Sequence, residues 1–183
     1  MQAKNQHINQ LLQRCKKGEQ SAQFEVYKCY YKAMYNAALR ILKDSFEAED
    51  VMQESFLVAF TKLGTFKGEV AFGAWLKRIV INRSLTQLRK NNRFQEVKLD
   101  VIPELKAENE ESGDFTMLKA SEITNAINKL KDNYRIALTL NLIEGFDYEE
   151  IADIMKITYQ NSRTTISRAK NKLRQLLVVS YEG

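Results

Sequence analysis

Acidic and amide side chains crowd one predicted helix of this chain. Asp50, Gln53, Glu54 and Leu57 recur at intervals of three and four residues, so they would share one helix face. Carboxylates on such a face can accept paired hydrogen bonds from the guanidinium groups of a basic protein partner. An ordinary solvated helix face shows the same spacing, so the pattern alone leaves both interpretations open.

A basic segment begins just after Trp75, and residues 77–93 hold six lysines and arginines with no acidic residue. Such a stripe binds nucleic acid by neutralising phosphates and releasing counterions, which makes its affinity depend on salt. Phe66, Phe72 and Trp75 could stack on unpaired bases, although aromatic residues at a helix start most often pack in the core. Asn82 could both donate and accept a hydrogen bond at a base edge.

A second acid-free stretch covers residues 154–181 and contains six lysines and arginines. Two predicted helices meet there through a short turn, which is typical of a helix-turn-helix. The second helix of that motif reads base edges in the major groove, while its neighbours contact phosphates. Arg163 is the best candidate for a base contact, and Arg168 and Lys170 are candidates for phosphate contacts or solvent-facing positions.

Helical spacing of apolar residues and capping signals predict that nearly everything outside one acidic segment is helical. The expected helices span residues 21–43, 46–63, 71–90, 117–130, 132–143, 148–155 and 159–177. The side chains placed to cap them are Ser21, Asp44 with Glu47, Asp132, Asp147 with Glu150, and Thr158. Gly64 and Gly145 are placed to end helices. No strand-like alternation is long enough to predict a sheet, so the predicted fold class is all-α.

The acidic segment separates two basic regions and contains the only proline, Pro103. The Lys/Arg and Asp/Glu counts are 16 and 8 in residues 1–94, 2 and 7 in 95–118, and 10 and 8 in 119–183. A stretch of this composition buries little apolar surface and is typical of a linker. We therefore expect two small helical domains, 1–94 and 116–183, joined by an acidic flexible linker over 95–115.

Composition also argues against several classes of protein. The 183 residues are 44% apolar, which is ample for packed cores. The single histidine, His7, and the lack of a phosphate loop or nucleophile elbow argue against an enzyme. Cys15 and Cys29 form no metal-binding motif, so no metal or cofactor is predicted. No apolar run is long enough for a membrane span and no signal core follows the N-terminus, so a cytoplasmic location is the default expectation.

Taken in order, these segments resemble the bacterial extracytoplasmic-function sigma factors of the sigma-70 superfamily. The Asp-x-x-Gln-Glu pattern at Asp50, Gln53 and Glu54 is similar to the family's helix that docks on the arginine-rich coiled coil of the RNA polymerase clamp. Residues 66–75 resemble the loop and helix start with which the family reads and melts the −10 promoter element. Residues 148–170 resemble its −35-reading helix-turn-helix. The resemblance therefore implies a sigma factor that binds core polymerase and directs promoter-specific initiation without a catalytic residue or cofactor.

The resemblance also implies site residues and partners. For polymerase binding these are Asp50, Gln53, Glu54 and Leu57. For the −10 element they are Phe66, Lys67, Phe72, Trp75, Lys77, Arg78, Asn82, Arg83 and Arg89. For the −35 element they are Thr158, Gln160, Asn161, Arg163, Thr164, Arg168 and Lys170. The implied partners are core RNA polymerase, promoter DNA and an anti-sigma factor that covers these surfaces.

Some positions depart from the family's pattern. Thr86 stands where an aspartate often follows Asn-x-x-Leu, and Thr165 replaces a frequent arginine. Lys156, Thr158 and Gln160 occupy turn positions that usually hold glycine, proline and glycine. These departures favour an unusual or weak −35 preference. They motivate the hypothesis that a further DNA-targeting protein helps to place the chain on its promoter.

Two other functions are compatible with parts of the sequence. The first is a free-standing helix-turn-helix regulator, although the N-terminal half lacks the α/β receiver or ligand-binding pattern that such proteins usually carry. The second is a helical adaptor whose basic faces only keep it in solution. Salt-sensitive DNA binding would separate the adaptor from both DNA-binding functions.

Overall fold

The computed structural model describes residues 2–91 and 120–179, and within those two ranges it contains helices and turns but no strand. The predicted all-α fold class is confirmed. The chain divides into two compact units, Met1–Arg93 and Phe94–Gly183, which are described separately below. The predicted linker over 95–115 lies outside the described residues, so the domain boundaries stay a prediction. Among the described helices, none has the length and apolarity needed to cross a membrane.

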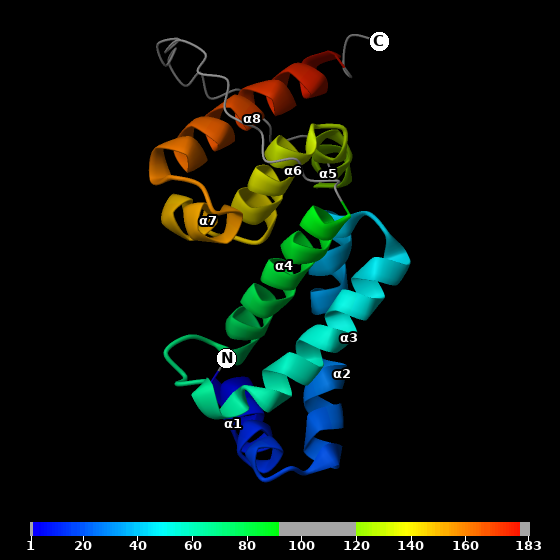
Figure 1. The fold of residues 1–183 in the computed structure, drawn as a ribbon, viewed down its shortest axis with the longest axis vertical. Helices are drawn as coiled ribbons and strands as arrows, with labels where there is room; N and C mark the ends of the chain where they lie inside the picture. Colours follow the sequence, from blue (N-terminus) through cyan, green and yellow to red (C-terminus); the bar gives the residue numbers. More distant parts are fainter. Residues whose placement is uncertain (1, 92–119, 180–183) are drawn as a thin grey trace. The chain divides into compact units, whose positions relative to one another are not determined.

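The first unit is a bundle in which α2 packs against both α3 and α4, and α1 covers part of α2 (Figure 1). Its elements are α1 (Gln2–Lys16), α2 (Gln20–Leu42), α3 (Ser45–Thr61), a 3-10 turn (Leu63–Thr65) and α4 (Phe72–Lys90). Fully buried apolar side chains from these helices form its core, among them Val26, Met34, Ile41, Met52, Leu76, Val80, Ile81 and Leu85. The core fixes which faces of α3 and α4 remain free.

Asp44 caps α3 as the sequence predicts. Its carboxylate accepts hydrogen bonds from the backbone N–H groups of Phe46 and Glu47, both at 3.0 Å. These bonds satisfy donors that the first turn of a helix leaves without partners, so they fix where α3 begins. The helix ends at Thr61, and Gly64 lies in the 3-10 turn that follows.

Helix α1 and the start of α2 differ from the sequence prediction. Arg14 donates to the Glu19 carboxylate at 2.7 Å and to Ser21 Oγ at 3.3 Å, so these side chains tie α1 to α2. Ser21 therefore does not cap α2, which begins one residue earlier, at Gln20. Helix α1 is not among the helices predicted from the sequence, although four buried side chains show helical spacing there. They are Ile8, Leu11, Leu12 and Cys15.

In the second unit, α6 and α7 pack against the long final helix α8. Its described elements are α5 (Ala120–Asn128), α6 (Asp132–Leu138), a π-helical turn (Thr139–Ile143), α7 (Tyr148–Met155) and α8 (Tyr159–Val179). Buried apolar residues from these elements hold the unit together, among them Ile127, Ile136, Leu140, Ile151, Ile154, Ile166 and Ala169. The α7–turn–α8 arrangement is the predicted helix-turn-helix.

The predicted caps of α7 and α8 are confirmed. Asp147 accepts from the backbone N–H of Glu150 at 2.8 Å, and Glu150 accepts from the backbone N–H of Asp147 at 3.0 Å, which completes a capping box. Thr158 Oγ1 accepts from the backbone N–H of Asn161 at 3.2 Å. Between the two helices, Lys156 adopts the left-handed conformation with a φ of 61°. Each end of the turn is therefore fixed by local hydrogen bonds or backbone geometry.

The predicted cap at Asp132 is wrong. Helix α6 begins at Asp132 itself, and its carboxylate accepts from the Arg135 side chain, at 2.9 Å from Nη2 and 3.2 Å from Nε. Arg135 is 1% exposed, and a buried guanidinium needs charge-assisted partners. The predicted helix 132–143 is thus an α-helix continued by a π-helical turn, and Gly145 ends it with a φ of 80°.

Candidate protein-binding and nucleic-acid interfaces

The acidic face of α3, defined by Asp50, Gln53, Glu54 and Leu57, is exposed along its length. All four side chains are accessible to solvent, and Leu57 is 68% exposed. Helix α3 carries four carboxylates and no basic side chain. The structure therefore brings together, on one exposed face of α3, all the residues that were predicted to bind polymerase.

Phe46 lies on the same face and was missed by the sequence analysis. It precedes Asp50 by four residues, which is one helical turn, and it is 81% exposed. Its spacing to Asp50 was a usable signal. The sequence did not indicate that Phe46 would be exposed, because an aromatic residue near a helix start is most often buried.

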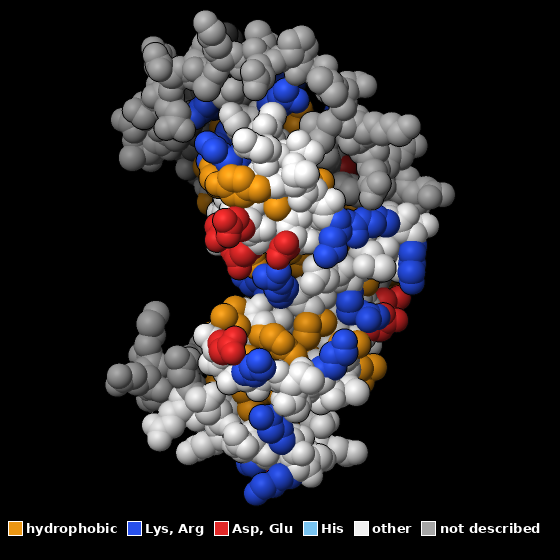
Figure 2. All heavy atoms as spheres, turned by 60° about the vertical axis from the view of Figure 1, so that its left-hand side comes forward, with side chains coloured by type: hydrophobic (Ala, Val, Ile, Leu, Met, Phe, Trp, Pro, Cys, Tyr) orange, Lys and Arg blue, Asp and Glu red, His pale blue; other side chains and the backbone are white. Residues whose placement is uncertain are grey.

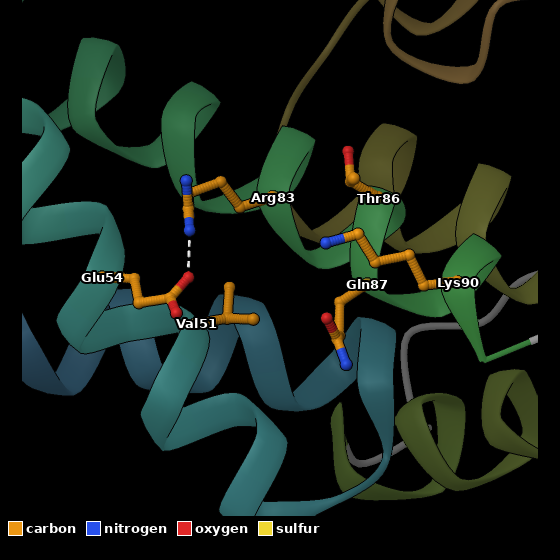
Figure 3. A pocket seen from close by; sticks show the side chains of 6 residues that line it. All are labelled: Val51, Glu54, Arg83, Thr86, Gln87 and Lys90. Atoms are coloured by element: carbon orange, nitrogen blue, oxygen red, sulfur yellow. Dashed lines mark hydrogen bonds and ion pairs between the residues drawn. The ribbon is translucent and has the colours of Figure 1, made fainter.

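Glu54 and Arg83 form an ion pair that joins α3 to α4 (Figure 3). The two residues were predicted to serve different partners, Glu54 the polymerase and Arg83 the DNA. Arg83 is 36% exposed and Glu54 59% exposed, and Arg83 Nε is buried without a hydrogen-bond partner. A shallow hollow surrounds the pair, and Figure 3 shows its other lining residues, Val51, Thr86, Gln87 and Lys90.

An aromatic cluster forms where the loop after the 3-10 turn meets α4. Phe66 lies 5.2 Å from Trp75 and 5.6 Å from Phe72 between ring centroids, and Phe72 lies 5.7 Å from Trp75. Phe66 and Trp75 are partly exposed, whereas Phe72 is 4% exposed. The packing therefore places Phe72 beneath the other two rings as a support, rather than at the predicted DNA-facing surface.

Tyr30 of α2 completes this cluster and was not anticipated. Its ring meets Phe72 edge-on at 5.6 Å, and burial raises the pKa of its hydroxyl. Gly73 allows this contact, because a Cβ at that position would lie 2.8 Å from Tyr30 Cε1. The orientation of the aromatic rings thus depends on contact between helices that are far apart in the sequence.

One accessible stripe of α4 contains four of the nine predicted −10 residues. Trp75, Arg78, Asn82 and Arg89 follow one another at helical spacing and share one accessible side of α4. Lys77 comes two residues after Trp75 and therefore projects from a different side of the helix. Lys67 is exposed in the loop before α4, and Thr86 donates from its hydroxyl to the Asn82 carbonyl at 2.8 Å.

The N-terminal part of α8 presents the predicted −35 residues. Thr158, Gln160, Arg163 and Thr164 are exposed, while Asn161, Arg168 and Lys170 are partly exposed. Helical spacing places Arg163 and Arg168 on opposite flanks of the face that contains Gln160 and Thr164. The arrangement matches a recognition helix that presents polar groups at its centre and cations at its edges.

Tyr159 is a further exposed residue of α8 that the sequence analysis did not select. It is 45% exposed, and the Arg163 guanidinium lies 5.9 Å from its ring centroid. This cation–π contact restricts Arg163, the predicted base-reading side chain. Thr165, which replaces the frequent arginine, is 8% exposed and packs inward.

Basic side chains are spread over the visible face in Figure 2, whereas acidic side chains form a few small groups. The helices that carry the predicted DNA-binding residues are uniformly basic, since α4 and α8 each hold five lysines and arginines and no acidic residue. Across residues 2–91 and 120–179, no three or more potential metal ligands gather in one place.

Comparisons with known proteins agree with this arrangement. The family Sigma-70 region 2 matches residues 26–94, and Sigma-70 region 4 matches residues 120–173. The RNA polymerase sigma-H factor of Pseudomonas aeruginosa is 31% identical over 179 residues, which cover 92% of each chain. The ECF RNA polymerase sigma-E factor of Salmonella typhimurium is 33% identical over 184 residues, which cover 91% of this chain and 94% of that one.

Among solved structures, the sigma factor RpoE from Bartonella quintana, in complex with the anti-sigma factor NepR, matches with a TM-score of 0.58 and 26% identity. The match covers 85% of this chain and 96% of that one. Family profiles, full-length relatives and fold thus identify the same group of proteins. The chain belongs to the extracytoplasmic-function sigma factors of the sigma-70 family and directs promoter-specific transcription initiation.

Proposed function

We propose that this sigma factor docks on core RNA polymerase through the acidic face of α3. The observation that carries the proposal is the charge of that helix, which holds four carboxylates and no base in a chain of net charge +5. An exposed acidic face favours a basic partner, and carboxylates pair well with arginine side chains.

The −10 element is proposed to meet the loop before α4 and the accessible stripe of that helix. Phe66 and Trp75 would stack on unpaired bases, while Arg78 and Arg89 would neutralise phosphates. Flipping a base out of the duplex costs a few kcal/mol, and stacking on an aromatic ring returns about 1–3 kcal/mol per base. Two partly exposed rings supported by Phe72 would therefore offset much of the cost of flipping a base.

The −35 element is proposed to meet the N-terminal part of α8. Arg163 would contact a base edge, and Arg168 and Lys170 would contact phosphates on either side. Because threonine occupies position 165, this chain lacks one cation that the family often has in this helix. A weak −35 contact favours a second protein that assists promoter binding, so that possibility stays part of the proposal.

The remaining partners follow from the same family membership. We propose that an anti-sigma factor regulates this chain, as the relative from Bartonella quintana is bound to one. The protein would act in the cytoplasm, where core polymerase meets promoter DNA. Its part in initiation would be binding and strand opening, without a catalytic residue or cofactor of its own.

The docking proposal is tested with Asp50→Lys, because that change avoids the Arg83 side chain beside Glu54. Placing a cation against a basic partner costs several kcal/mol, so the affinity for core polymerase should fall by roughly a hundredfold or more. Glu69→Lys is the matched control, since Glu69 is an exposed acid of the same unit and lies outside α3. Affinity is measured by titrating the labelled full-length chain with core polymerase in the absence of DNA. Equal affinities for the two variants would refute docking at this face.

The −35 proposal is tested separately with holoenzyme on its own promoter. Arg163→Ala should reduce promoter selectivity, because one good base contact contributes about 1–3 kcal/mol of discrimination. Efficient and selective initiation by the purified holoenzyme would exclude the need for a further targeting protein. Selective initiation that survives Arg163→Ala would show that Arg163 does not read the −35 element.

A further inference from the structure

Phe46 is the most exposed large hydrophobic side chain among the described residues, at 81%. It lies in the first turn of α3, whose backbone Asp44 fixes by accepting from the Phe46 N–H at 3.0 Å. Most of the ring is thus exposed to solvent at a helix start that the Asp44 cap holds in place. Together with Leu57, which is 68% exposed on the same face, it gives α3 two exposed apolar side chains beside its carboxylates, an arrangement that suits a protein interface.

We infer that Phe46 is an apolar anchor for core RNA polymerase that extends the acidic face of α3 by one helical turn. The inference rests on the proposed docking function and adds a contact that the Asp-x-x-Gln-Glu pattern does not contain. Phe46, Asp50, Gln53 and Leu57 stand at i, i+4, i+7 and i+11, so they form one stripe about 17 Å long. The stripe has an exposed apolar side chain at each end and polar side chains between them.

This layout fits a partner of a specific kind. Exposed apolar residues at both ends would enter shallow apolar sites, while the polar centre would pair with arginine or lysine. A length of about 17 Å corresponds to about three turns of α3. The polymerase surface that receives Phe46 is therefore expected to be basic at its centre and apolar beside it.

The charge of α3 argues against other occupants. A second copy of this chain, docked face to face, would oppose the same carboxylates on both sides. DNA and anionic membranes would meet like charge as well. A basic protein surface is the partner that the four carboxylates and the exposed ring both favour.

Phe24 of α2 provides a matched control on the same unit. It is 60% exposed, but the Lys28 ammonium lies 4.8 Å from its ring centroid. The Phe24 ring already makes a cation–π contact with Lys28, and the positive charge of Lys28 would repel a basic partner. Truncating Phe24 therefore removes an exposed aromatic ring without touching the acidic face.

The test compares the Kd for core polymerase of the full-length wild type with those of Phe46→Ala, Phe46→Leu and Phe24→Ala. Phe46→Ala should weaken binding by about tenfold or more, Phe46→Leu by less, and Phe24→Ala by no more than about twofold. Circular dichroism checks that each variant is folded. Since Phe46 is exposed, its truncation should leave the thermal transition where it is.

Three results would overturn the inference. The first is that Phe46→Ala binds core polymerase as tightly as wild type. The second is that Phe46→Ala and Phe24→Ala lose affinity for core polymerase equally. The third is that Phe46→Ala abolishes self-association in sedimentation while leaving the polymerase Kd unchanged, which would make a second copy the occupant. The Asp50→Lys variant distinguishes failure of this inference from failure of the proposed docking function. If Asp50→Lys loses binding and Phe46→Ala does not, the role of Phe46 is refuted and docking through the acidic face of α3 still holds. If Asp50→Lys binds normally, docking through that face is refuted as well.

Discussion

Breaking the ion pair between Glu54 and Arg83 is expected to change the stability of the first unit only slightly. Glu54 is 59% exposed and Arg83 36% exposed, so solvent screens the two charges. Two unit charges about 4 Å apart interact by about 1 kcal/mol in bulk water and about 4 kcal/mol near a protein surface. Ordering two long side chains offsets most of that gain, and exposed pairs measure about 0.2–1 kcal/mol.

The coupling energy is measured with a double-mutant cycle of Glu54→Gln, Arg83→Gln and the double variant. We expect a coupling of about 0.5–1 kcal/mol, toward the upper end of the range for exposed pairs because Arg83 Nε is already buried without a hydrogen-bond partner. Trp75 is the only tryptophan in the chain and lies in the first unit. Its fluorescence therefore reports urea unfolding of that unit without interference from the second.

The dependence of the coupling energy on salt concentration tests whether the ion pair is exposed to solvent. The coupling should shrink between about 0.1 M and 1 M salt, because the Debye length falls from about 10 Å to about 3 Å. A coupling above about 2 kcal/mol that persists at high salt would refute the argument, since it would require a pair shielded from solvent. In that case a loss of polymerase binding in Glu54 variants would reflect a damaged fold and not a lost contact.

Three further predictions concern single residues. Ser162→Ala should stabilise the second unit by roughly 0.5–1 kcal/mol, because Ser162 Oγ is buried without a hydrogen-bond partner; slower hydrogen exchange in α8 would confirm this and faster exchange would contradict it. Lys156→Gly should add about 0.5–1 kcal/mol, since Lys156 holds a φ of 61° that glycine adopts without strain; an unchanged or lower Tm for that unit would count against it. Iodoacetamide should alkylate Cys29 well before Cys15 at about pH 8, because Cys29 is exposed while burial of Cys15 raises the pKa of its thiol and leaves less thiolate. Peptide mass spectrometry measures the two rates, and equal rates would show that Cys15 is accessible.

Local signals in the sequence were enough to predict much of the fold. The capping box of Asp147 and Glu150 needs only residues within one helical turn, and both of its hydrogen bonds are present. Ser21 and Asp132 also have the right chemistry for caps, but each meets an arginine side chain instead. For Asp132 the competing group is the buried guanidinium of Arg135, whose need for a partner outweighs a surface cap. Burial of an arginine is not visible in a local pattern.

In the candidate surfaces too, features set by one helix could be predicted from the sequence, whereas features set by the packing of two helices could not. Helical spacing was sufficient to place Asp50 on one face with its neighbours, because a single helix determines that geometry. The pairing of Glu54 with Arg83 joins residues that are 29 positions apart, and only the packing of α3 on α4 brings them together. The contact of Tyr30 with the aromatic cluster likewise depends on how two helices pack. The assignment of individual residues to polymerase or DNA stays a prediction that the proposed experiments test.

The pairing of Glu54 with Arg83 also limits how such a chain can diverge. A lysine at position 54 would set two cations side by side, and a compensating Arg83→Glu would place a carboxylate on α4, a helix with no acidic residue that is proposed to bind DNA. Each position is therefore expected to keep the sign of its charge during evolution. Asp50 has no ion pair within the described residues, so its charge can change without this internal conflict. A sigma factor redesigned for an orthogonal polymerase should accordingly be altered first at Asp50, with Glu54 left in place.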